Sequence, residues 1–353
     1  MPAATVQGFI GAAFQAVGVP VAHSDLVGDV LTSADLRGIR SHGVARMSFF
    51  LVRLQNGTMN PRPDLRFEQG SDTTGLLHGD KAIGIVAAAR AMEEAMAMAG
   101  RFGSGFVAVR DSSHFGYAGY WSRRAMVEGF LGISMSNSGR RVAPTFSDES
   151  VLGTNPLSFT IAGRDDESDF FLDMATSAVA VGKVETALRE GRDIPQGWVA
   201  EAGERPILDD NGVLSYDAPL LPLGGEGDNT GGHKGYGLSL LVELLCGAVP
   251  GGSLADRIAG ASGDAPSAMG HFMGAIKIDG FRARGEVQAD MAETFALIRK
   301  SGRAPGHDRI LIPGEPEAMA EAQNRELGIP ITPALMDQLT RWNVQLGLGF
   351  DLG

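Results

Sequence analysis

The chain has 353 residues, of which 44% are hydrophobic and 20% are charged, and its formal net charge is −12. This length can bury the cores of roughly two or three lobes, and the composition is that of an ordinary globular protein. The acidic balance comes without a basic cluster that could neutralise phosphates, which excludes a nucleic-acid-binding protein.

The single cysteine, Cys246, excludes an intramolecular disulfide and a cysteine-based metal site, and we expect no bound metal. It lies in the apolar run 240–249, which predicts a buried thiol. The apolar stretch 8–22 follows no Lys or Arg and is broken by Gly18 and Pro20, so it predicts an amphipathic helix rather than a signal peptide. No stretch approaches about 20 uninterrupted apolar residues. We therefore expect a cytoplasmic protein without a membrane partner.

The first 70 residues or so predict helices, and one of these is expected to open at Ser41 and continue through Leu54. The periodicity then predicts a helix over 85–99 ended by Gly100, a strand over 106–109, a loop and helix within 111–126, and strands over 131–135, 157–161, 170–172 and 273–278. A loop-rich segment over 189–232 precedes a helix over 236–248. After residue 287 the chain is helical again, with a break at 311–315.

Helices at both ends of a central sheet predict an α/β or α+β enzyme. We expect three regions: an N-terminal helical lobe (1–70), a central cofactor- and substrate-binding α/β region (71–286), and C-terminal helices (287–353) that pack on the N-terminal lobe.

Ser41, His42 and Arg46 are the first candidate site residues. Positions i and i+4 of a helix are neighbours, so His42 and Arg46 are expected to point the same way. Arg binds a carboxylate through two hydrogen bonds, and His supplies a proton near neutral pH, as a 2-oxo acid requires. The alternative is an N-cap at Ser41 and a solvated charge at Arg46. A Ser41–His42 hydrolase is disfavoured, because adjacent helical residues point about 100° apart.

Glycine-rich loops supply the next candidates. The string 103–108 matches a dinucleotide fingerprint but lies between a helix and a following strand, which is the wrong order, so we reject it. The loop 114–119 follows a strand and starts a helix. Gly116 and Gly119 are expected to leave their amides open to a pyrophosphate, with His114 as a catalytic group at the strand end. The alternative is a capped turn.

Three further loops each have a functional and a purely structural interpretation. Lys234 lies in a glycine-rich loop before a helix, which favours an anion but lacks the spacing of a phosphate-binding loop. Asp173 follows a strand and could accept ribose hydroxyls, or the segment could simply cap a helix. Thr154 and Asn155 offer neutral hydrogen bonds to a carboxylate or hydroxyl, or form a turn before a strand.

Taken together and in this order, these segments resemble the malate/L-lactate dehydrogenase family that is unrelated to the Rossmann-type lactate dehydrogenases. Its members include ureidoglycolate, sulfolactate and 2,3-diketogulonate oxidoreductases and piperideine-2-carboxylate reductases. The resemblance is carried by Ser41-His42-Gly43-Val44 with Arg46, His114-Phe115-Gly116 with Gly119, Gly153-Thr154-Asn155-Pro156, Asp173-Met174-Ala175-Thr176-Ser177 with Gly182-Lys183, Pro195 with Gly197-Trp198, Lys234-Gly235-Tyr236-Gly237-Leu238 and Pro313-Gly314-Glu315.

This resemblance implies a non-Rossmann NAD(P)-binding α/β fold, a homodimer, NAD or NADP as cofactor, and reduction of a 2-oxo acid by the reduced cofactor. Reduction of a cyclic imino acid is the alternative, and a non-catalytic dinucleotide-binding protein is the rival from another class. By residue, the resemblance places catalysis at Ser41, His42 and His114, and substrate contacts at Arg46 and Thr154. The implied cofactor-binding residues are Phe115, Gly116, Tyr117, Ala118, Gly119, Asp173, Met174, Ala175 and Lys234, with Arg303 to Arg309 at the adenosine end.

Two departures bear on proton transfer. Some relatives have an acid where this chain has Lys183, and others have a Lys near Ser138. We therefore expect proton transfer at a histidine, first of all His114. Arg140 and Arg141 leave three alternatives open: a second anionic group of the substrate (at Arg141), the 2′-phosphate of NADP, or two surface charges.

Overall fold

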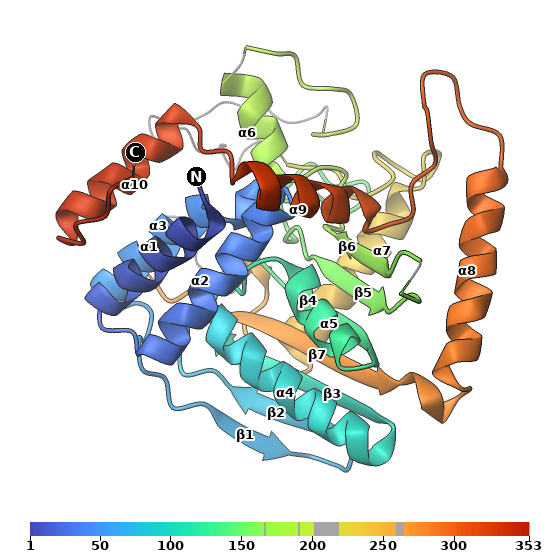
Figure 1. The fold of residues 1–353 in the computed structure, drawn as a ribbon, viewed down its shortest axis with the longest axis horizontal. Coiled ribbons are helices and arrows are strands. Elements are labelled where there is room, and N and C mark those ends of the chain that lie inside the picture. Colours follow the sequence, from blue (N-terminus) through green and yellow to red (C-terminus); the bar gives the residue numbers. More distant parts are fainter. Residues whose placement is uncertain (166, 190, 201–218, 259–264, 353) are drawn as a thin grey trace.

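A computed structural model describes residues 1–165, 167–189, 191–200, 219–258 and 265–352 (Figure 1). Its centre is a seven-stranded sheet in the order β1-β2-β3-β7-β4-β5-β6. The strands are β1 (Arg66–Gln69), β2 (Thr74–His78), β3 (Ser104–Ser112), β4 (Phe130–Ser136), β5 (Leu157–Ile161), β6 (Phe170–Met174) and β7 (Met269–Lys277). Only β2 and β3 pair in parallel, which confirms a mixed α/β fold unlike the parallel Rossmann sheet.

The late strand β7 determines which loops meet. It lies antiparallel between β3 and β4, so these two strands run parallel to one another and end at the same edge of the sheet. The register aligns Leu157, the first residue of β5, with Met135 near the end of β4 and with Met174 at the end of β6. Residues 113–119, 137–141, 153–156 and 175–177 therefore all emerge at one edge, which we call the site edge.

Helices cover both faces of the sheet because alternate strand residues point to opposite sides. On one face, Met273 and Ala275 of β7 join the core beneath α4 (Gly84–Phe102) and α5 (Ala118–Val127). On the other face, Phe272 and Ile276 pack with α7 (Gly232–Glu243) and the π-helical turn Leu244–Ala248 that continues it.

The two ends of the chain lie side by side (Figure 1). The helices α1 (Ala3–Ala16), α2 (Val21–Leu36) and α3 (Met47–Gln55) share one apolar core with residues of α10 (Pro333–Gln345). Ser48 accepts hydrogen bonds from Gln338 and Trp342, each at 2.7 Å, and the Met1 amine donates to the Ile329 carbonyl at 2.8 Å. α9 (Glu315–Leu327) contacts α2. The division of the chain at residues 70 and 286 stays a prediction.

The predicted strands and the long helix are confirmed, with differences at their ends. Helix α4 runs past Gly100 to Phe102, because the residue that ends it is Gly103 in the left-handed conformation (φ 90°). Helix α7 begins four residues before the predicted start at 236. β1 and β2 were not predicted: β1 is largely polar and exposed at the sheet edge, and β2 is a short strand in which only Leu77 is buried. α6 (Val181–Arg189) precedes the loop-rich segment, of which residues 201–218 lie outside the described chain.

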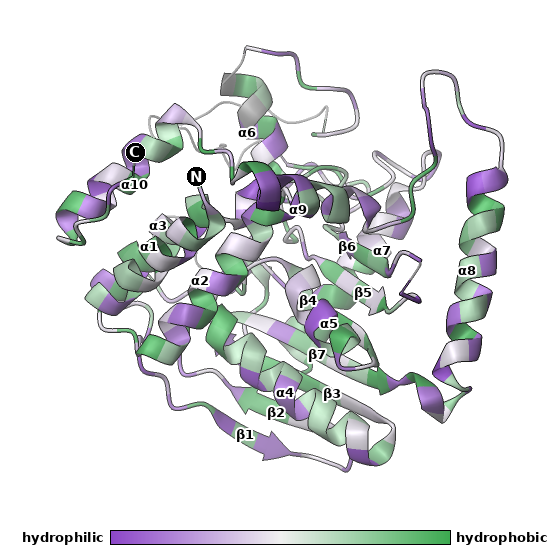
Figure 2. Ribbon diagram, viewed as in Figure 1, coloured by the Kyte–Doolittle hydropathy of each residue, from purple (hydrophilic) through white to green (hydrophobic). Residues whose placement is uncertain are grey.

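Helix α8 (Arg284–Lys300) stands away from the body of the molecule, and in Figure 2 it carries hydrophobic as well as hydrophilic residues. Only Phe295 of this helix is buried, whereas Leu297 is 72% exposed. Among the described residues, no helix is long and apolar enough to cross a membrane.

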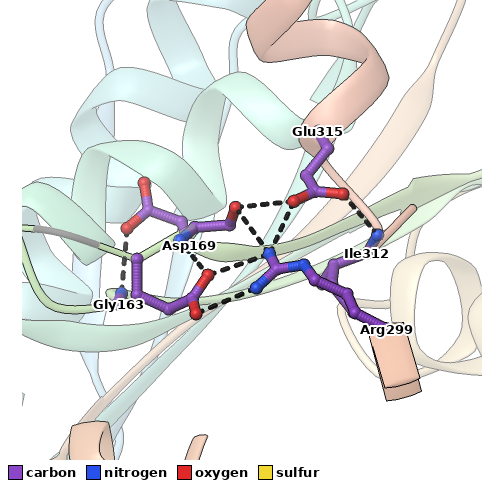
Figure 3. A network of polar contacts seen from close by, with 7 residues as sticks. Gly163, Asp169, Arg299, Ile312 and Glu315 are labelled. Carbon is purple, nitrogen blue, oxygen red and sulfur yellow. Dashed lines mark hydrogen bonds and ion pairs between the residues drawn. The ribbon is translucent and has the colours of Figure 1, made fainter. Parts of the chain in front are cut away.

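Arg299 anchors the carboxyl end of α8 (Figure 3). Its guanidinium donates to both carboxylate oxygens of Glu167 at 2.9 Å and to Glu315 at 2.6 Å. The Arg299 hydrogen bonds lower the pKa of Glu167. Burial would raise the pKa of Glu315, but the Ile312 amide and Arg299 outweigh it and the net direction is downward.

Arg299→Ala should lower the melting temperature at pH 7 by about 2 °C, because a network of ion pairs contributes about 1 kcal/mol. Carboxylates with lowered pKa stabilise the fold above their ordinary pKa, and this contribution is lost as the pH falls through the folded-state pKa. The difference between variant and wild type should therefore shrink on acidification to about pH 3. Thermal unfolding at several pH values measures it.

Arg282→Ala is the matched control, because Arg282 is also on the α8 side of the molecule and pairs with Asp290 and Glu286. These partners are more than half exposed, so the control should leave the melting temperature unchanged. Equal melting temperatures of both variants would contradict a role of Arg299 in anchoring α8.

Candidate active site

Ser41 and His42 do not open an α-helix, so that prediction is wrong. They lie in a 3₁₀ turn (Arg40–His42), and Gly43 is extended before a second 3₁₀ turn (Val44–Arg46) leads into α3. The cause is Asp35 of α2, which fills the space beside the glycine: a Cβ on Gly43 would lie 1.9 Å from Asp35 Oδ1. Asp35 Oδ2 accepts a hydrogen bond from the Val44 amide at 2.7 Å. Burial raises the pKa of Asp35 to about 7.

The tighter 3₁₀ turn also brings Ser41 and His42 together. Ser41 Oγ lies 2.8 Å from His42 Nδ1, so the expectation that these side chains point apart is wrong. The N-cap alternative fails as well, because no side chain caps this turn. Arg46 Nε donates to the Ser41 carbonyl at 3.3 Å, which closes Ser41, His42 and Arg46 into one cluster without the predicted helical spacing.

His114 lies against this cluster from the end of β3. Its ring centroid is 5.3 Å from that of His42, and the rings of Phe49 and Phe50 lie 5.7 and 5.9 Å away. The Gly116 amide donates to His114 Nδ1 at 3.2 Å. Nδ1 is therefore an acceptor, and the neutral ring carries its proton on Nε2.

Both histidines are neutral at pH 7. Burial, followed by the positive charge of Arg46, lowers the pKa of His42 to about 3. The same two causes, with smaller contributions from His42, His271 and Arg53, hold the pKa of His114 well below its usual range. The Arg53 guanidinium is buried and lies 3.9 Å from the centroid of the Phe49 ring.

The positive charge of Arg46 helps to lower the pKa of both histidines in this cluster. The pKa of Arg46 is lowered by burial, raised by the carboxylate of Glu185 on α6, and lowered by the neighbouring guanidinium of Arg141. Arg141 is half-buried, whereas Arg140 is exposed. A Cβ on Gly182 would come within 3.8 Å of Ser41, so the first turn of α6 borders the cluster, while Lys183 is exposed.

The amino end of α5 differs from the prediction that it holds open amides. The Gly119 amide donates to Asp173 Oδ2 at 3.0 Å and the Gly116 amide to His114 Nδ1 at 3.2 Å, so neither of these two amides is open. Burial raises the pKa of Asp173 to about 7. The side chains of Phe115, Tyr117 and Ala118 are 3% exposed, which leaves mainly their backbone for a ligand.

Thr154 lies at the site edge beside Ser138. The Thr154 amide donates to Ser138 Oγ at 3.1 Å, and the two hydroxyl oxygens are 3.4 Å apart. The Thr176 amide donates to the Thr154 carbonyl at 2.9 Å. This contact joins the segment before β5 to the segment after β6, where Met174 and Ala175 are half-buried.

Lys234 is exposed at the start of α7. Leu223 connects this helix end to the site edge, because its amide donates to the Thr176 carbonyl at 2.9 Å and its backbone closely faces Gly235. The remaining cofactor candidates lie on the exposed loop between α8 and α9. There Arg303 donates to the Asp308 carbonyl at 2.6 Å and Arg309 approaches the sulfur of Met319 at 3.1 Å.

These residues fit a dinucleotide in part. The exposed Lys234 at the start of α7 suits a pyrophosphate, and the Ser138 and Thr154 hydroxyls suit neutral polar groups. The amides of Gly116 and Gly119 are not free for a phosphate, because His114 and Asp173 accept from them. In the part of the chain that the structure describes, no group of three or more His, Cys, Asp or Glu side chains could hold a metal ion.

Sequence reasoning missed four kinds of contributor: the carboxyl group under Gly43, the buried cation near His114, the carboxylate facing Arg46, and a polar cluster beneath Thr154. These are Asp35, Arg53, Glu185, and Glu243, which joins the already named Asn155. Arg53, Glu185 and Glu243 lie far along the chain from the groups they face, and Asp35 lies on the preceding helix.

Known proteins provide an independent comparison. Residues 1–340 match the family model described as malate/L-lactate dehydrogenase. The chain is 38% identical over 332 residues to a malate dehydrogenase of Pyrococcus abyssi, covering 94% of this chain and 91% of the relative. It is 31% identical to a ureidoglycolate dehydrogenase (NAD(+)) of Escherichia coli K12, covering 90% and 88%.

An L-sulfolactate dehydrogenase of Methanocaldococcus jannaschii is 35% identical, with 95% of this chain and 93% of the relative covered. Its solved structure superimposes with a TM-score of 0.86 at 32% identity and covers 98% of this chain and 97% of that one. The match of sequence and fold over nearly the whole length agrees with the cluster at the site edge: the chain belongs to the malate/L-lactate dehydrogenase family.

Proposed function

We propose that this protein is an oxidoreductase that moves a hydride between a nicotinamide cofactor and C2 of a 2-hydroxy or 2-oxo acid. The observation that carries the proposal is the cluster of two neutral histidines beside one half-buried guanidinium, Arg46, at the site edge. The dehydrogenase activities of the malate, sulfolactate and ureidoglycolate relatives support it.

The bound nicotinamide supplies or accepts the hydride. Arg46 holds the C1 carboxylate through a bidentate ion pair, and Thr154 is placed to donate a hydrogen bond to the substrate. His114 donates its Nε2 proton in a hydrogen bond to the C2 oxygen. It does not give that proton up, because Nδ1 accepts from the Gly116 amide and the ring would be left as an anion.

Proton transfer then falls to His42 rather than to His114, which sequence reasoning placed first. When Ser41 Oγ accepts from His42 Nδ1–H, Nε2 is free to take the hydroxyl proton of the substrate during oxidation. In reduction the imidazolium of His42 returns that proton to the alkoxide. The negative charge of the bound substrate offsets Arg46 and raises the pKa of His42.

The substrate class follows from Arg141. Arg141 brings a second guanidinium close enough to Arg46 to lower its pKa, beside the Glu185 carboxylate that raises it, and a guanidinium is suited to bind a carboxylate or sulfonate through two hydrogen bonds. We therefore favour a 2-hydroxy acid with a second carboxylate or a sulfonate, such as a malate-like or sulfolactate-like compound, over a lactate-like one.

We also propose a homodimer. Large apolar side chains are exposed on α7 and at both ends of α8: Leu238 (37%), Leu241 (46%), Leu244 (46%), Phe281 (80%) and Leu297 (72%). A second copy of the chain would cover such a surface. A cytoplasmic location and the cofactor assignments of Arg303 and Arg309 stay predictions.

One panel of assays tests the proposed function. Purified protein is offered 2-oxo acids, the corresponding 2-hydroxy acids and cyclic imines, each with NAD and with NADP, while the nicotinamide absorbance is followed. Turnover of dicarboxylic or sulfonated acids is expected, and the two cofactor series decide between NAD and NADP. Turnover of imines alone would favour the imino-acid alternative. Cofactor binding without any turnover would leave a dinucleotide-binding protein.

Arg46→Ala should lower kcat/KM by roughly 100-fold, because the variant loses a bidentate charge-assisted contact. Arg46→Lys should recover little of it, since an ammonium lacks the planar pair of donors. Steady-state kinetics of oxidation measure both. Loss of the positive charge also raises the pKa of His42, so the acid limb of the kcat/KM profile should move to higher pH. Near-normal kinetics in both variants would remove Arg46 from the site.

His42→Gln and His114→Gln form a matched pair that separates proton transfer from hydrogen bonding. His42→Gln should lower kcat by roughly 10²- to 10⁴-fold, because glutamine cannot exchange a proton. His114→Gln retains an N–H donor and should lose roughly tenfold. The kcat of each variant, with cofactor affinity as a control, is the measurement. The reverse order would assign proton transfer to His114, as the sequence suggested.

Arg141→Ala should impair dicarboxylic or sulfonated substrates by roughly 10- to 100-fold and spare pyruvate-like ones, because it removes the partner of the second anionic group. The exposed neighbour gives the control: Arg140→Ala should change neither. A shift in the NADP-to-NAD ratio with an unchanged order of substrates would instead place Arg141 at a 2′-phosphate. No change in either quantity would leave Arg141 as a surface charge.

A further inference from the structure

A buried carboxyl group lies beneath the Thr154 loop. Glu243, the last residue of α7, is 4% exposed and accepts three hydrogen bonds. Its Oε2 accepts from Asn155 Nδ2 at 2.9 Å, and its Oε1 accepts from the Ala255 amide at 2.8 Å and from Asn137 Nδ2 at 3.3 Å. Burial raises the pKa of Glu243.

Asn155, the partner of Glu243, has an unusual backbone. It is fully buried and has φ +36°, a conformation that asparagine tolerates better than most residues. Its Oδ1 accepts from the Ser138 amide at 3.1 Å, and its Nδ2 donates to the Ser239 carbonyl at 3.0 Å as well as to Glu243. The side chain is therefore held at both ends, and the direction of each hydrogen bond is defined.

These contacts determine where Thr154 points. Glu243 accepts from the Asn155 side chain. Asn155 Oδ1 accepts from the Ser138 amide, and Ser138 Oγ accepts from the Thr154 amide. The Thr154 carbonyl is held by Thr176 on the other side. The hydroxyl of Thr154 is thus presented at the site edge while the residue after it is fully buried.

A single helix links this arrangement to the proposed cofactor side. Lys234 lies in the first turn of α7, and Glu243 ends it, directly before the π-helical turn Leu244–Ala248. π-helical turns are rare and occur often beside functional sites. Cys246 within this turn packs with Met135 and Leu157, which flank the Asn137 and Asn155 loops.

We infer that Glu243 and Asn155 are positioning residues that hold Thr154 against the substrate. This inference rests on the proposed function. Neither residue touches the substrate. The Asn155 amide must donate a hydrogen bond to the Glu243 carboxylate for Ser138 and Thr154 to keep their positions. The pair therefore acts through Thr154.

The experiment reverses the direction of the hydrogen bond between Asn155 and Glu243. In Glu243→Gln, an amide N–H would face the Asn155 amide N–H, and in Asn155→Asp two carboxyl groups would face one another. Each single variant should raise the KM for the 2-oxo acid by roughly 10- to 100-fold, because a buried polar group loses its partner. The KM for the cofactor should change by less than about twofold.

The double variant Asn155→Asp with Glu243→Gln should recover part of the lost affinity for substrate, because the carboxylate at position 155 regains a donor at position 243 but cannot replace the hydrogen bond from Asn155 to the Ser239 carbonyl. The glutamine introduced at position 243 would donate to the carboxylate introduced at position 155 and would still accept from Ala255 and Asn137. That carboxylate would still accept from the Ser138 amide. Asn155→Asp alone should regain activity on acidification, because a proton shared between the two carboxyl groups restores their contact. A purely structural loss would show neither rescue.

A Thr154→Val background tests whether the pair acts through this hydroxyl. There Glu243→Gln should add little further loss, since residues that act through one group are not additive. Glu167→Gln is the control for loss of a half-buried carboxylate away from the site edge: it removes one partner of Arg299 but should leave both KM values unchanged. Thermal unfolding of every variant accompanies the kinetics.

The inference would be overturned if both single variants kept the wild-type KM for the substrate, or if the double variant were no better than either single variant. Turnover by the wild-type protein would still uphold the proposed function. A wild-type protein that turns over no 2-hydroxy or 2-oxo acid would refute the proposed function, and this inference would fall with it.

Discussion

The antiparallel insertion of β7 between β3 and β4 is the constraint on which the candidate site depends. Strand β7 comes from residues 269–277, late in the chain, and it pairs with β3 and β4 over almost its whole length. Because it separates two parallel strands, the loops carrying His114 and Ser138 leave the sheet at the same edge, about 10 Å apart at two strand spacings. The β5 and β6 registers add Thr154 and Asp173 to that edge.

Two buried carboxyl groups and one half-buried one, that of Asp173, hold the loops that converge there. Asp35 accepts from the Val44 amide, Asp173 from the Gly119 amide and Glu243 from the Ala255 amide. Burial raises the pKa of all three. Because the folded-state pKa is raised, the stability that the protonated carboxyl groups contribute is full below the ordinary carboxyl pKa. It is lost as the pH rises, for Asp35 and Asp173 through about 7. Each of these carboxyl groups accepts a hydrogen bond from a backbone amide, and Arg46 is the cation that we propose for the substrate carboxylate.

Sequence patterns were sufficient for the fold wherever burial was periodic. The apolar stripe of α4 and the short runs of β4 to β7 predicted those elements within a few residues. β1 was not predicted because it is mostly polar and exposed, and β2 because it is short and buries only Leu77. The segments of the candidate site were also recognisable, since glycine, histidine and arginine stood in a recurring order.

What the sequence could not provide was the set of long-range contacts that decide local geometry. The helix predicted from Ser41 is broken because Asp35, from another helix, lies against Gly43. The amides predicted to be open at Gly116 and Gly119 are bound by His114 and Asp173. In each case a residue distant in sequence or a side chain folded back on the loop outweighed the local preference. The protonation of His114 follows from one such contact.

The central claim is that His42 and His114 are neutral in the free protein and that His114 carries its proton on Nε2. Nitrogen NMR of protein labelled at histidine tests this directly, with His42→Gln and His114→Gln used to assign the signals. The account predicts one protonated and one unprotonated ring nitrogen for each of the two residues, with no change between about pH 8 and 5. A His114 ring that gains a second proton near its ordinary pKa of about 6.5 would contradict it.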